Sequence, residues 1–239
     1  MNRATYFLDL YRQLEDLLRF RYDTDAASKR QGNTVLRFMN SQEGRRFKEE
    51  LDLCREVRNL LSHRSQFEGE SPVIPAESLI HFLEGLVAYL SDPPTALGIA
   101  TKTQDLLLAT RGNCIAELLS VMEKNGFSHV PVMEGEYLYG VFSAGVFGAY
   151  FKASPELPLG ADAKIESVYP YLPINKHSCE QYAFVSSGTA YETVKHLFAT
   201  KGPHKKRMAA VFVTEGGKRD EPLLGIITPW DVLKCEPRF

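Results

Sequence analysis

Apolar side chains in the first third of the chain recur at steps of three and four residues, which is the spacing of amphipathic helices. The predicted elements are helices over residues 5–20, 34–39, 42–63 and 76–90, and a loop rich in Gly, Ser and Pro over 67–75. Asn33 is the expected N-cap of the second helix, because its side chain accepts a hydrogen bond from a free backbone N–H. Ser91-Asp-Pro-Pro94 ends the helical pattern, since proline disfavours helix on both sides. We therefore expect an all-α helical bundle over residues 1–92.

After Pro94 the pattern changes to short apolar strands that alternate with helices, and the same order occurs twice. The first copy is predicted to contain a strand over 106–109, a helix over 113–125, a strand pair at 129–133 and 137–142, and a short helix after Ser143. The second is predicted to contain a strand over 182–185, a helix over 189–200, a strand pair at 209–213 and 223–227, and a last helix from Thr228. The expected fold class is therefore α+β and multidomain: a helical bundle followed by two β-α-β-β-α repeats.

The two copies also align in sequence, with Gly140-Val-Phe-Ser143 in the place of Gly225-Ile-Ile-Thr228. This order of elements, with His129-Val-Pro-Val132 in one copy and the run from Gly225 to Asp231 in the other, resembles the cystathionine-β-synthase (CBS) domain. The resemblance covers residues 97–234. It implies one pseudo-symmetric module, with a first repeat over 97–153, a linker over 154–181 and a second repeat over 182–239.

In the CBS family, the hydroxyl and carboxylate of a G-h-x-T/S-x-x-D motif often bind adenosine nucleotides, so the resemblance implies a nucleotide site. Thr228 and Asp231 occupy these positions in the second repeat. The first repeat has Ser143, but Val146 replaces the aspartate, so one site should recognise ribose and the other should be degraded. The implied regulatory ligand is AMP, ATP or a cyclic dinucleotide. The structural alternative is that Thr228 and Asp231 only cap the last helix.

A second candidate site lies in the helix over 42–63, whose buried stripe is predicted to contain Leu51, Cys54, Val57 and Leu61. Arg58 lies at the edge of that stripe, and Asn59 and His63 lie one turn apart on its polar flank. A fixed cation, an amide and an imidazole, whose ordinary pKa is about 6.5, suit the handling of phosphate. The alternative is a solvated helix face.

The spacing R-N-x-x-x-H at the end of a helix, inside a short helical domain, resembles the HEPN family. The resemblance implies a homodimer and a metal-independent ribonuclease that needs no catalytic cofactor. It makes His63 the general acid or base and Arg58 the group that stabilises the anionic phosphate, with Asn59 orienting His63 or the phosphate. A second copy of the chain would supply the other histidine. Glu56 is a candidate ion-pair partner of Arg58, and such a pair would hinder that role.

Composition limits these interpretations. The chain has 239 residues and a net charge of −2, so RNA contact requires a local patch or a dimer groove. Lys201-Gly-Pro-His-Lys-Lys-Arg207 is the densest basic run, either a solvated loop or a clamp on phosphates. Tyr169-Pro-Tyr-Leu-Pro173 is expected to be a packed linker. The four cysteines form no metal-binding spacing, and we expect no metal site. No signal peptide or membrane span is predicted, so we expect a reduced, cytoplasmic protein.

Two functions remain open at this point. The first is a homodimeric ribonuclease (a hydrolase) whose activity is gated by an adenine nucleotide bound to the CBS pair. The alternative is a non-catalytic dimeric regulatory protein, in which the helical domain only dimerises and the CBS pair reports adenylate status to a partner.

Overall fold

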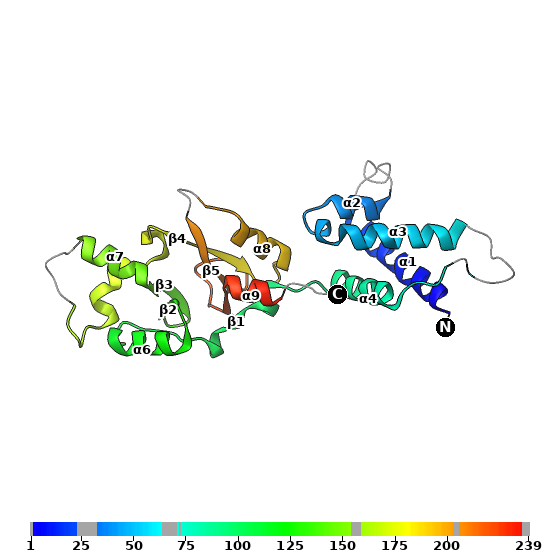
Figure 1. The fold of residues 1–239 in the computed structure, drawn as a ribbon. Coiled ribbons are helices and arrows are strands. Elements are labelled where there is room, and N and C mark those ends of the chain that lie inside the picture. The colour runs from blue at the N-terminus through cyan, green and yellow to red at the C-terminus, as the bar shows by residue number, and fades with distance from the viewer. Residues whose placement is uncertain are drawn as a thin grey trace. The chain divides into compact units, whose positions relative to one another are not determined.

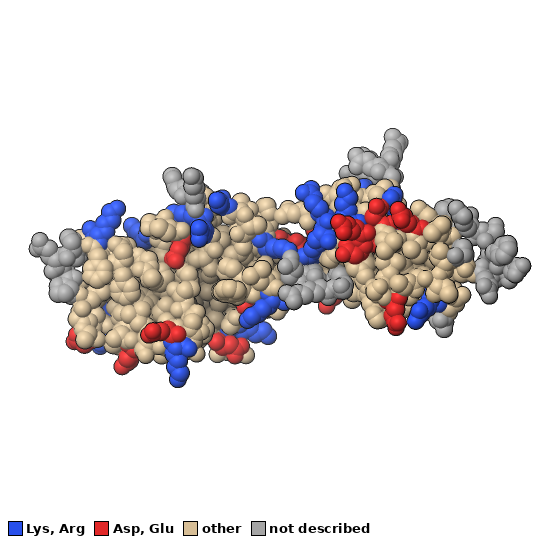
Figure 2. Space-filling model, in the orientation of Figure 1, with Lys and Arg blue, Asp and Glu red and all other residues tan. Residues whose placement is uncertain are grey.

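The computed structural model describes residues 2–22, 33–63, 71, 73–153, 159–202 and 206–235, with the backbone but not the side chains of Tyr22 and His63. The chain divides into two compact units between Pro93 and Pro94 (Figure 1). Acidic and basic side chains are interspersed on the visible face of each unit (Figure 2), so neither face shows a broad field of one sign. No helix in the described ranges is long and apolar enough to cross a bilayer.

The regular elements of the first unit are all helical among its described residues. They are α1 (Arg3–Tyr22), α2 (Thr34–Asn40), a 3₁₀ turn (Gly44–Phe47), α3 (Lys48–His63) and α4 (Glu77–Ser91). The Asn33 cap is confirmed, because its side-chain oxygen accepts a hydrogen bond from the Val35 N–H at 2.9 Å. The helix expected over 42–63 is shorter than predicted: Gly44 begins a separate 3₁₀ turn, and α3 starts only at Lys48.

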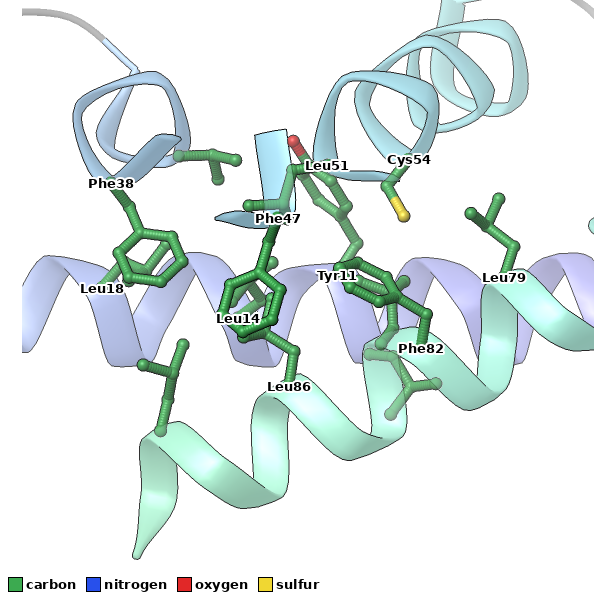
Figure 3. Packing of buried hydrophobic residues seen from close by; sticks show 14 of the residues in the cluster. Tyr11, Leu14, Leu18, Phe38, Phe47, Leu51, Cys54, Leu79, Phe82 and Leu86 are labelled. Atoms are coloured by element: carbon green, nitrogen blue, oxygen red, sulfur yellow. The ribbon is translucent and has the colours of Figure 1, made fainter. Parts of the chain in front are cut away.

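Aromatic and aliphatic side chains from all four helices fill the core of the first unit (Figure 3). Phe7, Leu14 and Leu18 of α1 are fully buried, as are Leu51 of α3 and Leu83 of α4. The predicted stripe on α3 is confirmed in its first half, where Leu51 and Cys54 are buried. Val57 and Leu61 pack against the same core and are partly buried. This packing fixes which flank of α3 faces outward.

The second unit alternates strands and helices. Its first half contains α5 (Ala96–Ile99), β1 (Thr101–Lys102), a 3₁₀ turn (Thr103–Asp105), α6 (Ile115–Asn125), β2 (His129–Glu134), β3 (Tyr137–Ser143) and α7 (Ala144–Ala153). Two 3₁₀ segments (Ile165–Tyr171 and Ile174–Lys176) follow. The second half contains β4 (Glu180–Ser186), α8 (Tyr191–Ala199), β5 (Arg207–Thr214), β6 (Gly225–Ile227) and α9 (Pro229–Lys234). The mixed helix and strand content expected of this part is therefore present.

The strands form two sheets. One has the order β1-β6-β5-β4, with β4 and β5 parallel and the other pairs antiparallel; the other is the β2–β3 hairpin. The strand predicted over 106–109 is wrong: only Ala109 pairs, in a single parallel bridge to Val132. The strand of that region is β1, which pairs with β6 from the other repeat. The strand expected over 223–227 begins at Gly225.

Tyr169-Pro-Tyr-Leu-Pro173 is a packed linker, as predicted. Leu172 is fully buried and Tyr169 is nearly so. The Tyr169 ring stacks on Tyr139 with 3.8 Å between centroids, and its hydroxyl donates to Glu134. The linker is therefore part of the core of the second unit, and its carbonyl groups are held in fixed positions.

Candidate functional site

An open pocket of about 560 Å³ lies at the N-terminal ends of β2, β4 and β5. Its lining residues are His129, Ser178, Cys179, Glu180, Lys206, Arg207 and Ala209. Strand register explains why they meet: Glu180 of β4 is opposite Arg207 of β5, and His129 of β2 is opposite Ser143 of β3. Residues from both repeats therefore contribute to one cavity.

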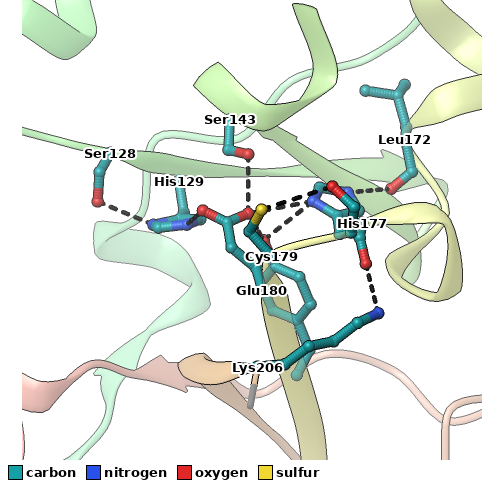
Figure 4. A network of polar contacts seen from close by, with 10 residues as sticks. Ser128, His129, Ser143, Leu172, His177, Cys179, Glu180 and Lys206 are labelled. Carbon is teal, nitrogen blue, oxygen red and sulfur yellow. Dashed lines mark hydrogen bonds and ion pairs between the residues drawn. The ribbon is translucent and has the colours of Figure 1, made fainter. Parts of the chain in front are cut away.

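The Glu180 carboxylate is the centre of a hydrogen-bond network at this pocket (Figure 4). Its Oε1 contacts His129 Nε2 at 2.9 Å. Its Oε2 accepts from Ser143 Oγ at 3.0 Å and from Tyr182 OH at 2.8 Å, and contacts His177 Nδ1 at 3.1 Å. We call these five residues the Glu180 cluster. Donors from His129 and His177 chiefly hold the pKa of Glu180 well below its usual range, so the carboxylate is ionised at neutral pH.

Basic side chains give the pocket a positive character. Lys206 Nζ donates to the backbone oxygen of His177 at 2.6 Å, which holds the ammonium group at the rim. Arg207 is exposed and lines the same cavity. Since the hydrogen bonds of Glu180 are made within its own cluster, Lys206 and Arg207 are the pocket cations that an anion can contact. The predicted basic run therefore reaches the pocket at its C-terminal end, while residues 203–205 lie outside the described part of the chain.

The three residues predicted for nucleotide binding are already engaged. Ser143 is 1% exposed, and its hydroxyl donates to Glu180. The N–H and hydroxyl of Thr228 both donate to Asp231 Oδ2, at 2.8 and 2.7 Å, which caps α9. Asp231 Oδ1 has no hydrogen bond among the described residues. The helix-capping alternative is therefore present in the structure, and it leaves one carboxylate oxygen available.

Register places Thr228 near the pocket. Ile227 of β6 is opposite Val211 of β5, so Thr228 follows at the end of the sheet where β5 begins. Ser143 lies opposite His129 at the corresponding place in the first repeat. The two motif hydroxyls are thus both near the cavity ends of their strands. Val146, which replaces the motif aspartate in the first repeat, is 1% exposed and packs in the core.

Sequence reasoning missed the roles of His129, His177 and Glu180. His129 was noted only as part of a strand motif, and nothing local marks Glu180 as different from other acidic residues. Its partners come from positions up to 51 residues away in the sequence. A usable signal was the histidine at the start of β2, since an imidazole at the start of a buried strand requires a polar partner.

At the other predicted site, on α3, the arginine Arg58 forms its ion pair with a neighbouring helix. Arg58 Nη2 donates to Glu15 Oε1 of α1 at 3.2 Å, so its ion-pair partner is Glu15 and not the candidate Glu56. Arg58 Nη1 donates to Asn59 Oδ1 at 3.2 Å, so these two predicted site residues do meet. The Arg58 guanidinium also lies 5.6 Å from the ring centroid of the buried Tyr11. The side chain of His63 lies outside the described residues.

No cluster of three or more His, Cys, Asp or Glu residues that suits a metal ion occurs in the described ranges. Cys54 is buried, and burial raises the pKa of its thiol to about 12, so it is a core residue and not a nucleophile.

Comparisons with known proteins give matches among solved structures alone. No protein-family profile matches the chain, and no curated protein matches it. CBSX2 in complex with AMP is 19% identical, with a TM-score of 0.41, and covers 59% of this chain and 94% of its own. CbpB in complex with c-di-AMP is 16% identical, with a TM-score of 0.45, and covers 64% and 90%. The CBS domains of a transcriptional regulator from Streptococcus pneumoniae are 16% identical, with a TM-score of 0.38, and cover 60% and 99%.

Proposed function

We propose that the second unit is a CBS pair, with repeats at 97–153 and 182–239, that binds an adenine nucleotide and acts as a regulatory unit. The observation that carries the proposal is the pocket at the starts of β2, β4 and β5, where Lys206 and Arg207 lie beside a carboxylate whose hydrogen bonds are made within the Glu180 cluster. Cations of this kind, held at the rim of a cavity, recognise phosphate groups.

The nucleotide would lie with its phosphates at Lys206, Arg207 and His129. Asp231 Oδ1 would accept a hydrogen bond from a ribose hydroxyl, because Oδ2 is occupied by the cap of α9. Ser143 would act indirectly, by positioning Glu180. This arrangement agrees with the sequence-based prediction that only the second repeat recognises ribose.

Isothermal titration with AMP, ATP and cyclic di-AMP tests the proposal. Arg207→Gln removes a pocket cation, and Lys124→Gln removes an exposed cation at the end of α6 as the matched control. We expect at least one of the three ligands to bind, and about tenfold weaker binding for Arg207→Gln with no change for Lys124→Gln. Absence of binding by all three, or equal affinities for both variants, would contradict the proposal.

A second candidate is a homodimeric, metal-independent HEPN-type ribonuclease in the first unit, gated by the nucleotide. It is favoured by the hydrogen bond between Arg58 and Asn59 on a partly exposed flank of α3. The Glu15 carboxylate would have to release Arg58 when RNA phosphate binds. If the first unit only dimerises, the protein is the non-catalytic regulator described above.

Cleavage of a mixed single-stranded RNA, with chelator present, separates these alternatives. We expect cleavage to be lost in His63→Ala and retained in His81→Ala, which changes an exposed histidine of α4. Analytical ultracentrifugation of the same samples reports the dimer. If the wild-type protein cleaves no RNA with or without nucleotide, the regulatory alternative holds and the ribonuclease is excluded.

A further inference from the structure

The carboxylate of Glu180 lies among four polar side chains, much as a bound anion would (Figure 4). The hydroxyls of Ser143 and Tyr182 both donate to its Oε2, at 3.0 and 2.8 Å. His129 Nε2 lies 2.9 Å from Oε1. His177 Nδ1 lies 3.1 Å from Oε2 and 3.4 Å from the Tyr182 hydroxyl. The two carboxylate oxygens thus occupy the positions that the oxygens of a free anion would take on the same partners.

These partners form a site with a buried floor and an open side. Ser143 is 1% exposed and the side chain of His177 is 2% exposed, so both belong to the floor. Glu180 itself is 25% exposed at its side chain and lines the pocket of about 560 Å³. A small anion from solution can therefore reach this place through the pocket when the Glu180 side chain does not fill it.

The same place is the start of helix α7, which adds to its preference for negative charge. A Cβ added at Gly145, in the first turn of α7, would lie 3.7 Å from Glu180 Oε2. The backbone N–H groups of a first helical turn have no partner within the helix, and the helix dipole is positive there. The carboxylate is therefore placed where both the side chains and the helix favour an anion.

The second repeat shows what Glu180 replaces. The hydroxyl of Thr228 donates to the carboxylate of Asp231, which lies three residues ahead on the same helix. Ser143 is the equivalent hydroxyl in the first repeat, but the residue three positions ahead is Val146, which has no side-chain oxygen. The negative charge beside Ser143 is instead supplied by Glu180, at the start of β4.

We propose that Glu180 is an internal ligand: its carboxylate fills an anion site at the start of α7, and a free carboxylate of matching size binds there once this side chain is shortened. The intact chain thus occupies the anion site of its first repeat with a group of its own. A consequence that rests on the proposed function is that the chain binds one mononucleotide and not two.

Rescue of Glu180→Ala by acetate tests the internal ligand in the full chain. This substitution removes the Cγ and the carboxylate, which are the atoms that acetate supplies. We expect sodium acetate, at a concentration roughly tenfold above its dissociation constant, to raise the melting temperature of Glu180→Ala by about 3 °C relative to sodium chloride. Acetamide has the same shape without the charge and should have little effect.

Three proteins serve as controls for the general effect of the salt. In the wild type the carboxylate fills the site, and in Glu180→Gln an amide of the same shape fills it. Glu123→Ala removes an exposed carboxylate of α6 and leaves the site intact. None of the three should gain from acetate beyond what they share. Sucrose in every sample favours the compact state of all variants, which keeps a weakened Glu180→Ala folded.

An equal gain from acetate in the wild type and in Glu180→Ala would overturn the internal ligand. So would a Glu180→Ala chain that gains nothing from acetate, or that stays unfolded in acetate and sucrose together. Titration of the wild type with AMP gives the number of molecules bound per chain, and a value of two would overturn it as well. If the wild type binds no nucleotide while acetate rescues Glu180→Ala, the proposed function fails and the internal ligand stands.

Discussion

Ser143 and Thr228 show how residues at equivalent places in a repeat acquire different partners. Each hydroxyl ends a strand and precedes a helix, which is why the sequence pattern pairs them. Thr228 donates to Asp231, three residues ahead, whereas Ser143 has Val146 at that distance and donates to Glu180, at the start of β4. The loss of the local acceptor in the first repeat therefore coincides with a long-range contact, and that contact holds the Glu180 cluster together.

The substitution Glu180→Gln tests how much this cluster contributes to the stability of the fold. The folded-state pKa of Glu180 is lowered, so its carboxylate stabilises the fold above the unfolded-state pKa of about 4.3 and loses that contribution as the pH falls through the folded value. We expect the free energy of unfolding to drop by about 1–3 kcal/mol at neutral pH. The difference from wild type should narrow steadily as the solution is acidified below about pH 4.

Urea unfolding at several pH values measures this difference. Glu123→Gln, at an exposed position of α6, is the matched control and should change little at any pH. If Glu180→Gln lowers the free energy of unfolding by the same amount at acidic and neutral pH, the four hydrogen bonds do not depend on the ionised carboxylate. The cluster as described would then be wrong.

A second prediction concerns Asp231, because capping α9 and binding ribose would use different oxygens of its carboxylate. Its Oδ2 accepts the Thr228 N–H at the start of α9. Asp231→Ala should lower the unfolding free energy by about 1 kcal/mol, and Asp231→Asn, which keeps an acceptor, should cost less. If the residue also binds ribose, nucleotide affinity falls in both variants. An unchanged affinity, measured by titration, limits Asp231 to the cap.

At the scale of elements, two glycines show the internal symmetry of the second unit. Gly140 begins the aligned tetrapeptide in β3, and Gly225 begins it in β6. A Cβ at Gly140 would lie 2.3 Å from the backbone oxygen of Leu172, and one at Gly225 would lie 2.7 Å from that of Thr101. In both repeats the strand is thus approached closely by a backbone carbonyl of another segment, which is why glycine stands there.

Alanine at either position should therefore be strongly unfavourable. The added methyl group must displace a backbone segment and not a flexible side chain, so Gly140→Ala and Gly225→Ala are each expected to lower the unfolding free energy by about 2 kcal/mol. Gly148→Ala in α7 is the control, because nothing lies within 4 Å of its added Cβ. That variant should be neutral or more stable, since alanine favours helix. Thermal unfolding of all three proteins gives the comparison, and equal melting temperatures would contradict the close approach.

The elements themselves were largely predictable because most have a clear apolar period. The helices α1, α4, α6 and α8 and the strands β2, β3 and β5 lie within a few residues of their expected bounds. The strand predictions failed where the pairing partner is distant in the sequence. Leu106, Leu107 and Leu108 resemble a strand in composition, yet only Ala109 finds a neighbouring strand edge. The partner of β1 is β6, more than 120 positions later in the chain, and no local pattern encodes that choice.

The candidate sites were predictable in outline and not in their contacts. Motif spacing directed attention to Thr228, Asp231 and the basic run. Lys206 and Arg207 of that run line the pocket, and strand register places Thr228 at the end of the sheet where β5 begins. It did not reveal His177 or Glu180, because their roles arise from hydrogen bonds between repeats and through the linker. For the same reason the sequence offers Arg58 a candidate partner on its own helix, Glu56, whereas the structure pairs it with Glu15 of α1.

At the scale of the whole molecule, the chain contains two separate sets of buried apolar residues. Among the described residues, the core of the first unit consists of side chains from α1 to α4 and the 3₁₀ turn between α2 and α3. The described cores of the second unit consist of residues after Pro94. Pro93 and Pro94 follow the end of α4 and separate the two sets. A unit that buries its own apolar surface has the main requirement for independent folding.

A fragment that spans residues 94–239 should consequently fold without the helical unit. We expect it to show a cooperative urea transition and ordered aromatic signals in near-ultraviolet circular dichroism, because Tyr139, Tyr169 and Phe142 are packed entirely within the second unit. It should also bind the same nucleotide as the intact chain with an affinity within about threefold, or 0.6 kcal/mol. A fragment that is compact but lacks near-ultraviolet signals would show that the second unit needs the first for its packing. A folded fragment that has lost nucleotide binding would instead show that residues 1–93 contribute to the site, and the pocket defined by His129, Lys206 and Arg207 would then be incomplete.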